Sequence, residues 1–287
     1  MAAESNLINA SDLAPAISID LASNFAKSIK ALQEILGIST LQPVPVGSTA
    51  KQYKLVAGTL NAQSAEGDII PLTEVTRQAV ANISIGLNAY RKSTSAQAIQ
   101  AVGRDMAING TDEALISKIQ GAIKAAFFTS LATGTGTVTG ATLQPALANA
   151  WGKVKEYFED YDATPVHFIS VDDAATYLGS ATISLQTEFG MTYVENFLGL
   201  GTVVICPSLD AGEFYSTAKE NLRAVYVPAT SGDVGQSFGL NADETGLIGF
   251  THQAQVDRAT IDTLILTGVT FFPEMVDGVF KGTINPS

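Results

Sequence analysis

The amino-acid sequence of 287 residues predicts a protein of mixed α and β structure, and three observations lead to this class. Apolar residues recur with the 3.6-residue period of a helix along 111–131. They alternate with polar residues along 81–88, which is the two-residue period of a strand. Further strand patterns follow at irregular intervals in the second half of the chain, and no repeat of fixed period is present.

The composition is apolar and poor in charge. Charged residues make up 15% of the chain, against about 25% in an ordinary soluble domain. Hydrophobic residues make up 46%, and the mean hydropathy is +0.21. These values exclude intrinsic disorder, and the single cysteine, Cys206, excludes a disulfide scaffold. Two interpretations stay open: a monomer with a neutral polar surface, or a chain that covers much of its exterior with partners.

The charge balance is acidic, with 16 Lys and Arg against 28 Asp and Glu, a net charge of −12. Nucleic-acid-binding proteins usually carry a basic patch, so this class is disfavoured. No stretch reaches the roughly 18 apolar residues that a membrane helix requires. The first residues lack the basic segment and apolar core of a secretory signal. We therefore expect no membrane partner and a cytoplasmic origin.

The first predicted element is a helix over 11–38 that ends near Gly37. Its apolar stripe consists of Leu21, Phe25, Ile29, Leu32 and Leu36. Two extended runs follow within 46–90, at 52–57 and 81–88, and we predict that they pair as strands. The apolar side of the second run consists of Ala81, Ile83, Ile85 and Leu87.

A connection of about 15 residues, 59–74, joins the two runs, and connections of this length are usually functional or disordered. It is not a polar linker, because apolar residues stand among its acids. Apolar residues on a protruding loop are unfavourable unless another surface covers them. The segment therefore either folds back on its own core or docks on a neighbour. The candidate contact residues are Glu66, Asp68, Ile69, Ile70 and Leu72.

The middle of the chain predicts a short helix over 95–108 and a long one that has Thr111 as its N-cap. Asp112 and Glu113 lie in the first turn of the long helix, where the helix dipole favours acids. Its predicted buried stripe consists of Leu115, Ile119, Ala122, Ile123, Ala126 and Phe127. The Gly- and Thr-rich residues 134–140 that follow are expected to be flexible and to mark a domain boundary.

The second half predicts a helix over 143–161 with Pro145 at its first position. The apolar face of this helix consists of Leu147, Trp151, Val154 and Phe158. A buried strand follows at 166–170, and Ser170 and Asp173 then open a short helix as a capping box. Further strands are predicted at 202–206, 222–227, 245–251 and 261–272.

The sequence contains no set of residues that indicates a reaction. The glycines of 134–140 have the wrong spacing for a dinucleotide loop and follow a helix, and there is no P-loop or G-x-S-x-G motif. His167 and His252 lack metal-ligand spacing, so packed or hydrogen-bonded histidines are expected. Cys206 has apolar neighbours and is expected to be a buried thiol. We predict no catalytic residue, no cofactor and no metal.

Eight sequence segments, taken in order, resemble the major capsid proteins of tailed bacteriophages with the Hong Kong 97-type fold, in the form found in phages of Gram-positive hosts. The segments are EGDIIPLTEVT (66–76), TDEALISKIQGAIKAAFFTSL (111–131), LQPALANAWGKV (143–154), VDDAATYL (171–178), FGMTYVENFLGLGTVV (189–204), GEFYSTAKENLRAVYV (212–227), SGDVGQSFGLNADETGLIGFTH (231–252) and GVTFFPEMVDGVFKGTI (268–284). Each segment alone is weakly specific, whereas their order and spacing are more so.

The resemblance implies an α+β, Hong Kong 97-like fold with an N-terminal arm, an extended E-loop β-hairpin, a peripheral domain with a long spine helix, and an axial domain. The implied boundaries are 1–45 for the arm, 46–90 for the E-loop, 91–140 for the peripheral domain, 141–246 for the axial domain and 247–287 for the return to the peripheral domain. The E-loop tip would then lie across an adjacent subunit.

The implied function is that of a head protein without enzymatic activity, which assembles with itself into pentamers and hexamers of an icosahedral shell. The shell would enclose double-stranded DNA, which it would meet by non-specific proximity only. The expected location is the virion capsid, after synthesis and assembly in the cytoplasm of a bacterial host. Expected partners are a portal, a separate scaffolding protein and decoration proteins.

Two departures from the best-known member of the family matter. That protein begins with a long scaffolding segment that is cleaved off, whereas here the arm begins almost at once, so scaffolding is expected to be separate or a leader already absent. It also crosslinks its E-loop through a lysine. Residues 59–73 contain no lysine, so we expect no covalent crosslink.

Two alternatives to the capsid hypothesis stay open. One is an encapsulin-like nanocompartment shell, which would have the same fold and would contain cargo enzyme instead of nucleic acid. The other, more remote, is a cytoplasmic α/β enzyme or ligand-binding protein. Only the mixed α and β architecture supports this alternative.

Overall fold

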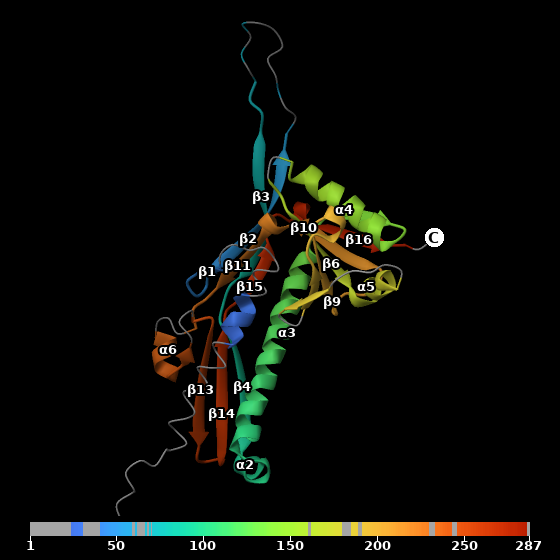
Figure 1. Cartoon of the computed structure of the whole chain (residues 1–287). Helices are drawn as coiled ribbons and strands as arrows, with labels where there is room; N and C mark the ends of the chain where they lie inside the picture. Colours follow the sequence, from blue (N-terminus) through green and yellow to red (C-terminus); the bar gives the residue numbers. More distant parts are fainter. Residues whose placement is uncertain are drawn as a thin grey trace, which may run out of the picture. The chain divides into compact units, whose positions relative to one another are not determined.

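The computed structural model describes residues 24–30, 41–58, 61, 67, 69, 71–159, 162–179, 185–188, 191–229, 233–242 and 246–285 (Figure 1). The chain divides into two compact units, which are treated separately below. Unit 1 is built from 1–48, 85–128 and 224–271, and unit 2 from 49–84, 129–223 and 272–287. Both units combine helices with sheets, in agreement with the predicted class.

Unit 1 contains a four-stranded antiparallel sheet in the order β12-β13-β14-β4. Its strands are β12 (Asn241–Ala242), β13 (Ile248–Gln255), β14 (Thr260–Thr267) and β4 (Asn88–Ser95). The unit also contains the helical residues 24–30, helix α6 (Asp233–Phe238) and β1 (Leu41–Pro43), which pairs in parallel with residues 224–226 of β11 (Leu222–Tyr226). Strand β15 (Thr270–Pro273) also belongs to this small sheet. Of the stripe predicted for 11–38, Phe25 and Ile29 are fully buried, and the other members lie outside the described residues.

Helix α3 (Thr111–Leu131) is the longest in the chain as described, and its start corrects the prediction. Helix α2 (Ala96–Val102), capped by Ser95, ends at Gly103, which has a φ of 83°. A π-helical segment, η1 (Asp105–Gly110), then runs directly into α3. Thr111 is therefore not an N-cap: its Oγ1 donates to the carbonyls of Ala107 and Ile108 in the preceding turn.

The buried face of α3 is also shifted from the predicted stripe. Ala122 and Ala126 are exposed, whereas Ile116, Phe128 and Leu131 are buried with the predicted Ile119, Ile123 and Phe127. Phe127 packs against Phe128 and, edge-on, against Phe271. Alanine has little apolar surface to hide, so the larger Ile and Phe side chains decide which face is buried.

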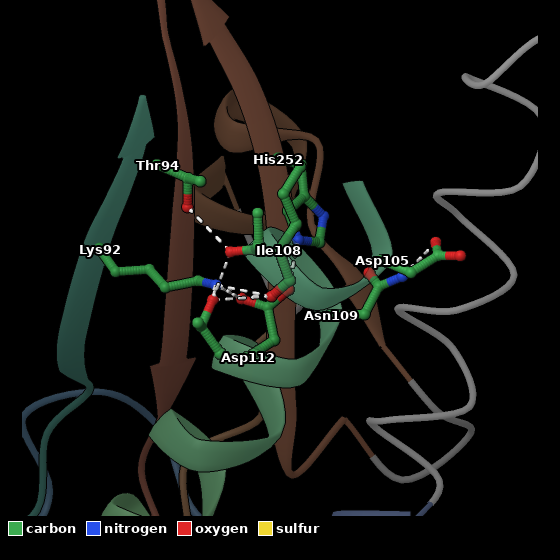
Figure 2. Close-up of polar contacts among 9 residues, drawn as sticks. Lys92, Thr94, Asp105, Ile108, Asn109, Asp112 and His252 are labelled. Atoms are coloured by element: carbon green, nitrogen blue, oxygen red, sulfur yellow. Dashed lines mark hydrogen bonds and ion pairs between the residues drawn. The ribbon is translucent and has the colours of Figure 1, made fainter. Parts of the chain in front are cut away.

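A cluster of three polar side chains, Lys92, Asp112 and His252, fixes the start of α3 to the sheet of unit 1 (Figure 2). The carboxylate of Asp112 is fully buried and lies 2.8 Å from Lys92 Nζ of β4 and 2.8 Å from His252 Nε2 of β13. Lys92 Nζ also donates to the carbonyl of Ile108 at 2.7 Å and to the hydroxyl of Thr111. Asp112 is therefore a bridge between two strands and a helix, and it does more than favour the helix dipole.

Unit 2 contains a seven-stranded mixed sheet in the order β5-β16-β10-β6-β9-β8-β7. The strands are β5 (Gly136–Gly140), β16 (Phe280–Ile284), β10 (Glu213–Ala218), β6 (Pro165–Ser170), β9 (Thr202–Cys206), β8 (Met191–Val194) and β7 (Gln186–Glu188). The pairs β5–β16 and β6–β9 are parallel, and the other pairs are antiparallel. Helices α4 (Leu143–Tyr157) and α5 (Val171–Leu178) pack on the sheet. One-turn helices are η2 (Phe197–Gly199), η3 (Lys219–Asn221) and η4 (Val276–Gly278).

The core of unit 2 joins α4 and α5 to the sheet, and it includes Leu147, Val154, Phe158, Ala174 and Phe214. The predicted buried strand 166–170 is confirmed, because every residue of β6 is buried. Ser170 caps α5 as predicted, with its Oγ accepting from the Asp173 N–H at 3.1 Å.

Several predicted bounds in unit 2 are wrong. Residues 136–140 form β5, a regular edge strand: an added Cβ on Gly136 would lie 2.4 Å from the ring of Phe280, and one on Gly140 would lie 2.4 Å from the Cα of Ala146. These glycines allow close packing and do not make a flexible linker. Helix α4 ends at Tyr157, Pro145 is its third residue, and Trp151 is 36% exposed instead of buried.

The strand predicted over 261–272 is two strands, β14 and β15, separated at Gly268. The Gly268 carbonyl accepts from the Val227 N–H at 3.2 Å, and an added Cβ at Gly268 would lie 2.9 Å from the Val227 side chain. The backbone approaches its neighbour too closely there for any other residue, and the strand ends.

His167 is a buried neutral histidine of β6, as predicted. Its Nε2 donates to the Leu200 carbonyl at 3.2 Å, so its Nδ1 accepts from the Ser216 hydroxyl at 2.7 Å. Burial lowers the pKa of His167 from 6.5 to about 4, and the hydrogen bond to Leu200 opposes only part of this. Cys206 is likewise buried, as predicted.

Replacing Asp112 by Asn should lower the free energy of unfolding by about 2–4 kcal/mol, because Lys92 and His252 would lose their partner in a mostly buried site. Urea unfolding of the purified chain measures this. Glu113→Gln, one residue along in the exposed part of the same turn, is the control and should change stability by less than about 0.5 kcal/mol. Equal effects of the two variants would contradict the assigned role of Asp112.

Stability should also fall on acidification through His167. Below pH 6.5 the unfolded chain binds a proton at this imidazole, whereas the folded chain does so only near pH 4, so the free energy of unfolding should drop by about 3 kcal/mol across that interval. His167→Gln removes this contribution. The difference between the two stability–pH curves isolates it from the carboxylates, and parallel curves would show that His167 titrates normally.

Candidate interaction surface

Two strands of unit 2 form a separate two-stranded ribbon, β2 (Thr49–Ala57) and β3 (Val75–Ser84), which Figure 1 shows running side by side away from the sheet. The register runs from Thr49 opposite Ser84 to Ala57 opposite Val75, so two strands pair here as predicted. The predicted bounds are wrong, because the second strand is 75–84 instead of 81–88, and of the predicted first run 52–57 only Gln52 lies opposite a residue of 81–88. The register shifts between Gln52 and Tyr53, which leaves Val80 as the extra residue of a β-bulge.

Large apolar side chains of the ribbon and its connection are exposed. Ile69 is 94% exposed and Leu72 is 93% exposed, and Val75, Val80 and Val56 follow along the strands. The Asn61 Nδ2 donates to the Leu72 carbonyl at 2.8 Å, and its N–H to Thr73 Oγ1 at 3.0 Å, so hydrogen bonds continue past the last strand pair. The other candidate contact residues, Glu66, Asp68 and Ile70, lie outside the described residues.

The middle of the ribbon is fixed to the rest of unit 2 through β2. Gln52 is 2% exposed, and its Nε2 donates to the Pro273 carbonyl at 3.1 Å and to Ser130 Oγ at 3.4 Å. The next residue, Tyr53, donates its N–H to the Glu274 carbonyl at 2.8 Å. Both contacts therefore lie opposite the bulge of β3, at the point where the register changes.

Charged side chains surround the same place. Glu274 pairs with Arg77 of β3 and with Arg223 Nε of β11 at 2.8 Å, and the guanidinium of Arg77 lies 3.8 Å over the ring of Tyr53. Lys54 lies 3.8 Å from Asp277. Burial alone would raise the pKa of Glu274, but the hydrogen bonds and charges of Arg223 and Arg77 outweigh it and hold the pKa below its ordinary value. The carboxylate is therefore ionised at neutral pH.

The arrangement offers a surface for contact with another molecule. Among the described residues, no group of three His, Cys, Asp or Glu could hold a metal ion. Within the same residues, no helix is both long and apolar enough to cross a bilayer. What unit 2 presents instead is an anchored ribbon with exposed apolar side chains.

The anchoring residues were not predicted from the sequence. Glu274 follows β15 in an apolar segment, where the sequence indicates an isolated surface acid. Its partner Arg77 lies 197 positions earlier in the chain, so the pair has no local signature. A polar Gln52 between Lys51 and Tyr53 on a strand gave the only local signal, and a strand residue of this kind is usually solvated.

Comparisons by sequence find nothing: no protein-family model matches the chain, and no curated protein matches it significantly. Comparison of structures finds similar chains. The capsid of an empty GTA particle matches with a TM-score of 0.58 at 10% identity, covering 89% of this chain and 90% of the other. A chain from Microbacterium phage Oxtober96 matches with a TM-score of 0.53 at 11% identity, covering 88% and 90%. A virus-like particle from Pyrococcus furiosus matches with a TM-score of 0.51 at 9% identity, covering 91% and 97%.

The chain has a Hong Kong 97-like capsid fold. The predicted α+β class and its capsid architecture are confirmed by these matches, which extend over nearly the full length of both partners. At sequence identities of 9–11%, these structural matches establish the fold of this chain and not its cargo, host or partners.

Proposed function

We propose that this chain is the major capsid protein of a tailed phage, which assembles with itself into an icosahedral shell around the double-stranded DNA genome. The observation that carries the proposal is the capsid fold, matched over about nine-tenths of the chain. Such a protein is a structural component of the virion and catalyses no reaction. Portal, scaffolding and decoration proteins would complete the particle, and assembly would take place in the cytoplasm of the host.

In this proposal the β2–β3 ribbon is the E-loop, and its tip docks on an adjacent copy. The exposed Ile69 and Leu72 support this role, because burying each would contribute about 1.5–3 kcal/mol. Glu66 and Asp68 would pair with basic residues of the neighbour and set the register of the contact. The four-stranded sheet with α3 would be the peripheral domain, and the seven-stranded sheet the axial domain.

The acidic composition fits a container that does not bind its contents tightly. Non-specific affinity for DNA grows with the number of basic phosphate contacts, and this chain has a net charge of −12. An encapsulin-like shell would share the fold, and the content of purified particles separates the two: DNA supports the phage head, and a cargo enzyme supports the compartment.

Sedimentation and negative-stain microscopy of the purified chain test the proposal together with the role of the ribbon. Wild type should form closed shells. The double variant Ile69→Ser, Leu72→Ser should stay unassembled, with a melting temperature within about 2 °C of wild type, because both side chains are in water in the free subunit.

Val256→Ser is the control, since Val256 is 91% exposed in the turn between β13 and β14 and the substitution likewise replaces an exposed apolar side chain, but outside the ribbon. It should assemble normally. A wild type that remains monomeric at all concentrations would refute the capsid function. Normal shells from the double variant would refute the docking role of the tip.

A further inference from the structure

One residue of unit 2 touches both strands of the β2–β3 ribbon and the body to which the ribbon is attached. The Glu274 carboxylate pairs with Arg77 of β3 and with Arg223 of β11. Its carbonyl accepts the N–H of Tyr53 in β2 at 2.8 Å, and its own N–H donates to the Asn221 carbonyl at 2.8 Å. Glu274 therefore contacts β2 through its main-chain carbonyl and β3 through its carboxylate.

The body side of this contact is rigid. The Asn221 side chain is 1% exposed, donates to the Met275 carbonyl at 2.9 Å and accepts the Met275 N–H at 2.7 Å. It also donates to Thr217 Oγ1 at 3.0 Å, inside the buried strand β10. Glu274 is thus fixed at the edge of the core, while Arg77 reaches it from an exposed strand.

We infer that Glu274 is a positioning residue that fixes the direction in which the outer part of the ribbon, from Val56 to Thr76, leaves unit 2. Contacts on β2 alone, at Gln52, Tyr53 and Lys54, would let the ribbon twist about that strand, because a two-stranded ribbon has little stiffness of its own. The ion pair between Glu274 and Arg77 attaches β3 to the body of unit 2 as well. Arg77 also stacks on Tyr53 of β2, so the two strands and Glu274 are linked to one another.

The consequence for assembly rests on the proposed function. If the tip docks on a neighbouring copy, a ribbon held in one direction is ready to bind, and a ribbon that samples many directions is competent only part of the time. Apparent affinity falls in proportion to the competent fraction. Glu274 would then control shell formation without being part of the contact.

The test compares Glu274→Gln with wild type by hydrogen exchange on unassembled subunits. Exchange in 54–57 and 75–78 should accelerate about fivefold, as expected for loss of a half-exposed ion-pair network, while exchange in β9 stays unchanged. Arg77→Gln, which alters only the exposed partner, should give the same pattern. Glu156→Gln is the control: it breaks the exposed pair with Lys153 on α4 and should leave the ribbon unaffected.

Assembly is measured separately on the same variants. The concentration at which half of the chain forms shells should rise about fivefold for Glu274→Gln, and not for Glu156→Gln. Unchanged exchange in the ribbon, faster exchange in β9 as well, or normal assembly despite faster ribbon exchange would each overturn the inference. A wild type that never assembles, with the ribbon effect intact, refutes the proposed function and leaves the anchoring role standing.

Discussion

A two-stranded ribbon that packs on no helix or sheet leaves the side chains on both of its faces in water unless another molecule covers them. The outer part of the β2–β3 ribbon and its connection are in this situation, and they carry exposed valines as well as Ile69 and Leu72. In a monomer such an element is unfavourable, because the same apolar side chains would be more stable if they were packed on a core. Under the proposed function, the low charge density of the chain would have the same explanation, because surface that other copies cover carries few charges.

A ribbon of this kind needs a rigid support. In unit 2 the support is a mixed sheet whose central strands are buried, with α4 and α5 packed on it. Polar groups then connect the ribbon to this core: Gln52 to Pro273, Tyr53 to Glu274, and Arg77 through Glu274 to Arg223. A hydrogen bond or ion pair has a direction, whereas an apolar contact does not. Polar anchoring therefore suits an element whose angle matters more than its contribution to stability.

The sequence predicted those parts of the fold that have a local signature. The helix over 111–131, the strand over 202–206 and the cap of α5 at Ser170 come from patterns within one element, and the structure reproduces them. The errors arise where contacts with residues distant in the sequence determine the local structure. Gly268 ends a strand because Val227 lies against it, and Gly136 belongs to a strand because Phe280 leaves no room for a side chain. Asp112 and Glu274 bind partners far along the chain, so neither position shows in a window of neighbours.

Under the proposed function, the tip of the ribbon is exposed in the free subunit and covered in the shell. A Leu72→Cys variant tests it directly, because the only natural cysteine, Cys206, is buried. The rate of alkylation by a water-soluble maleimide is measured for unassembled subunits and for closed shells of the same variant. We expect rapid labelling of the subunits and strong protection in the shells. Equal labelling rates in the two states would contradict it.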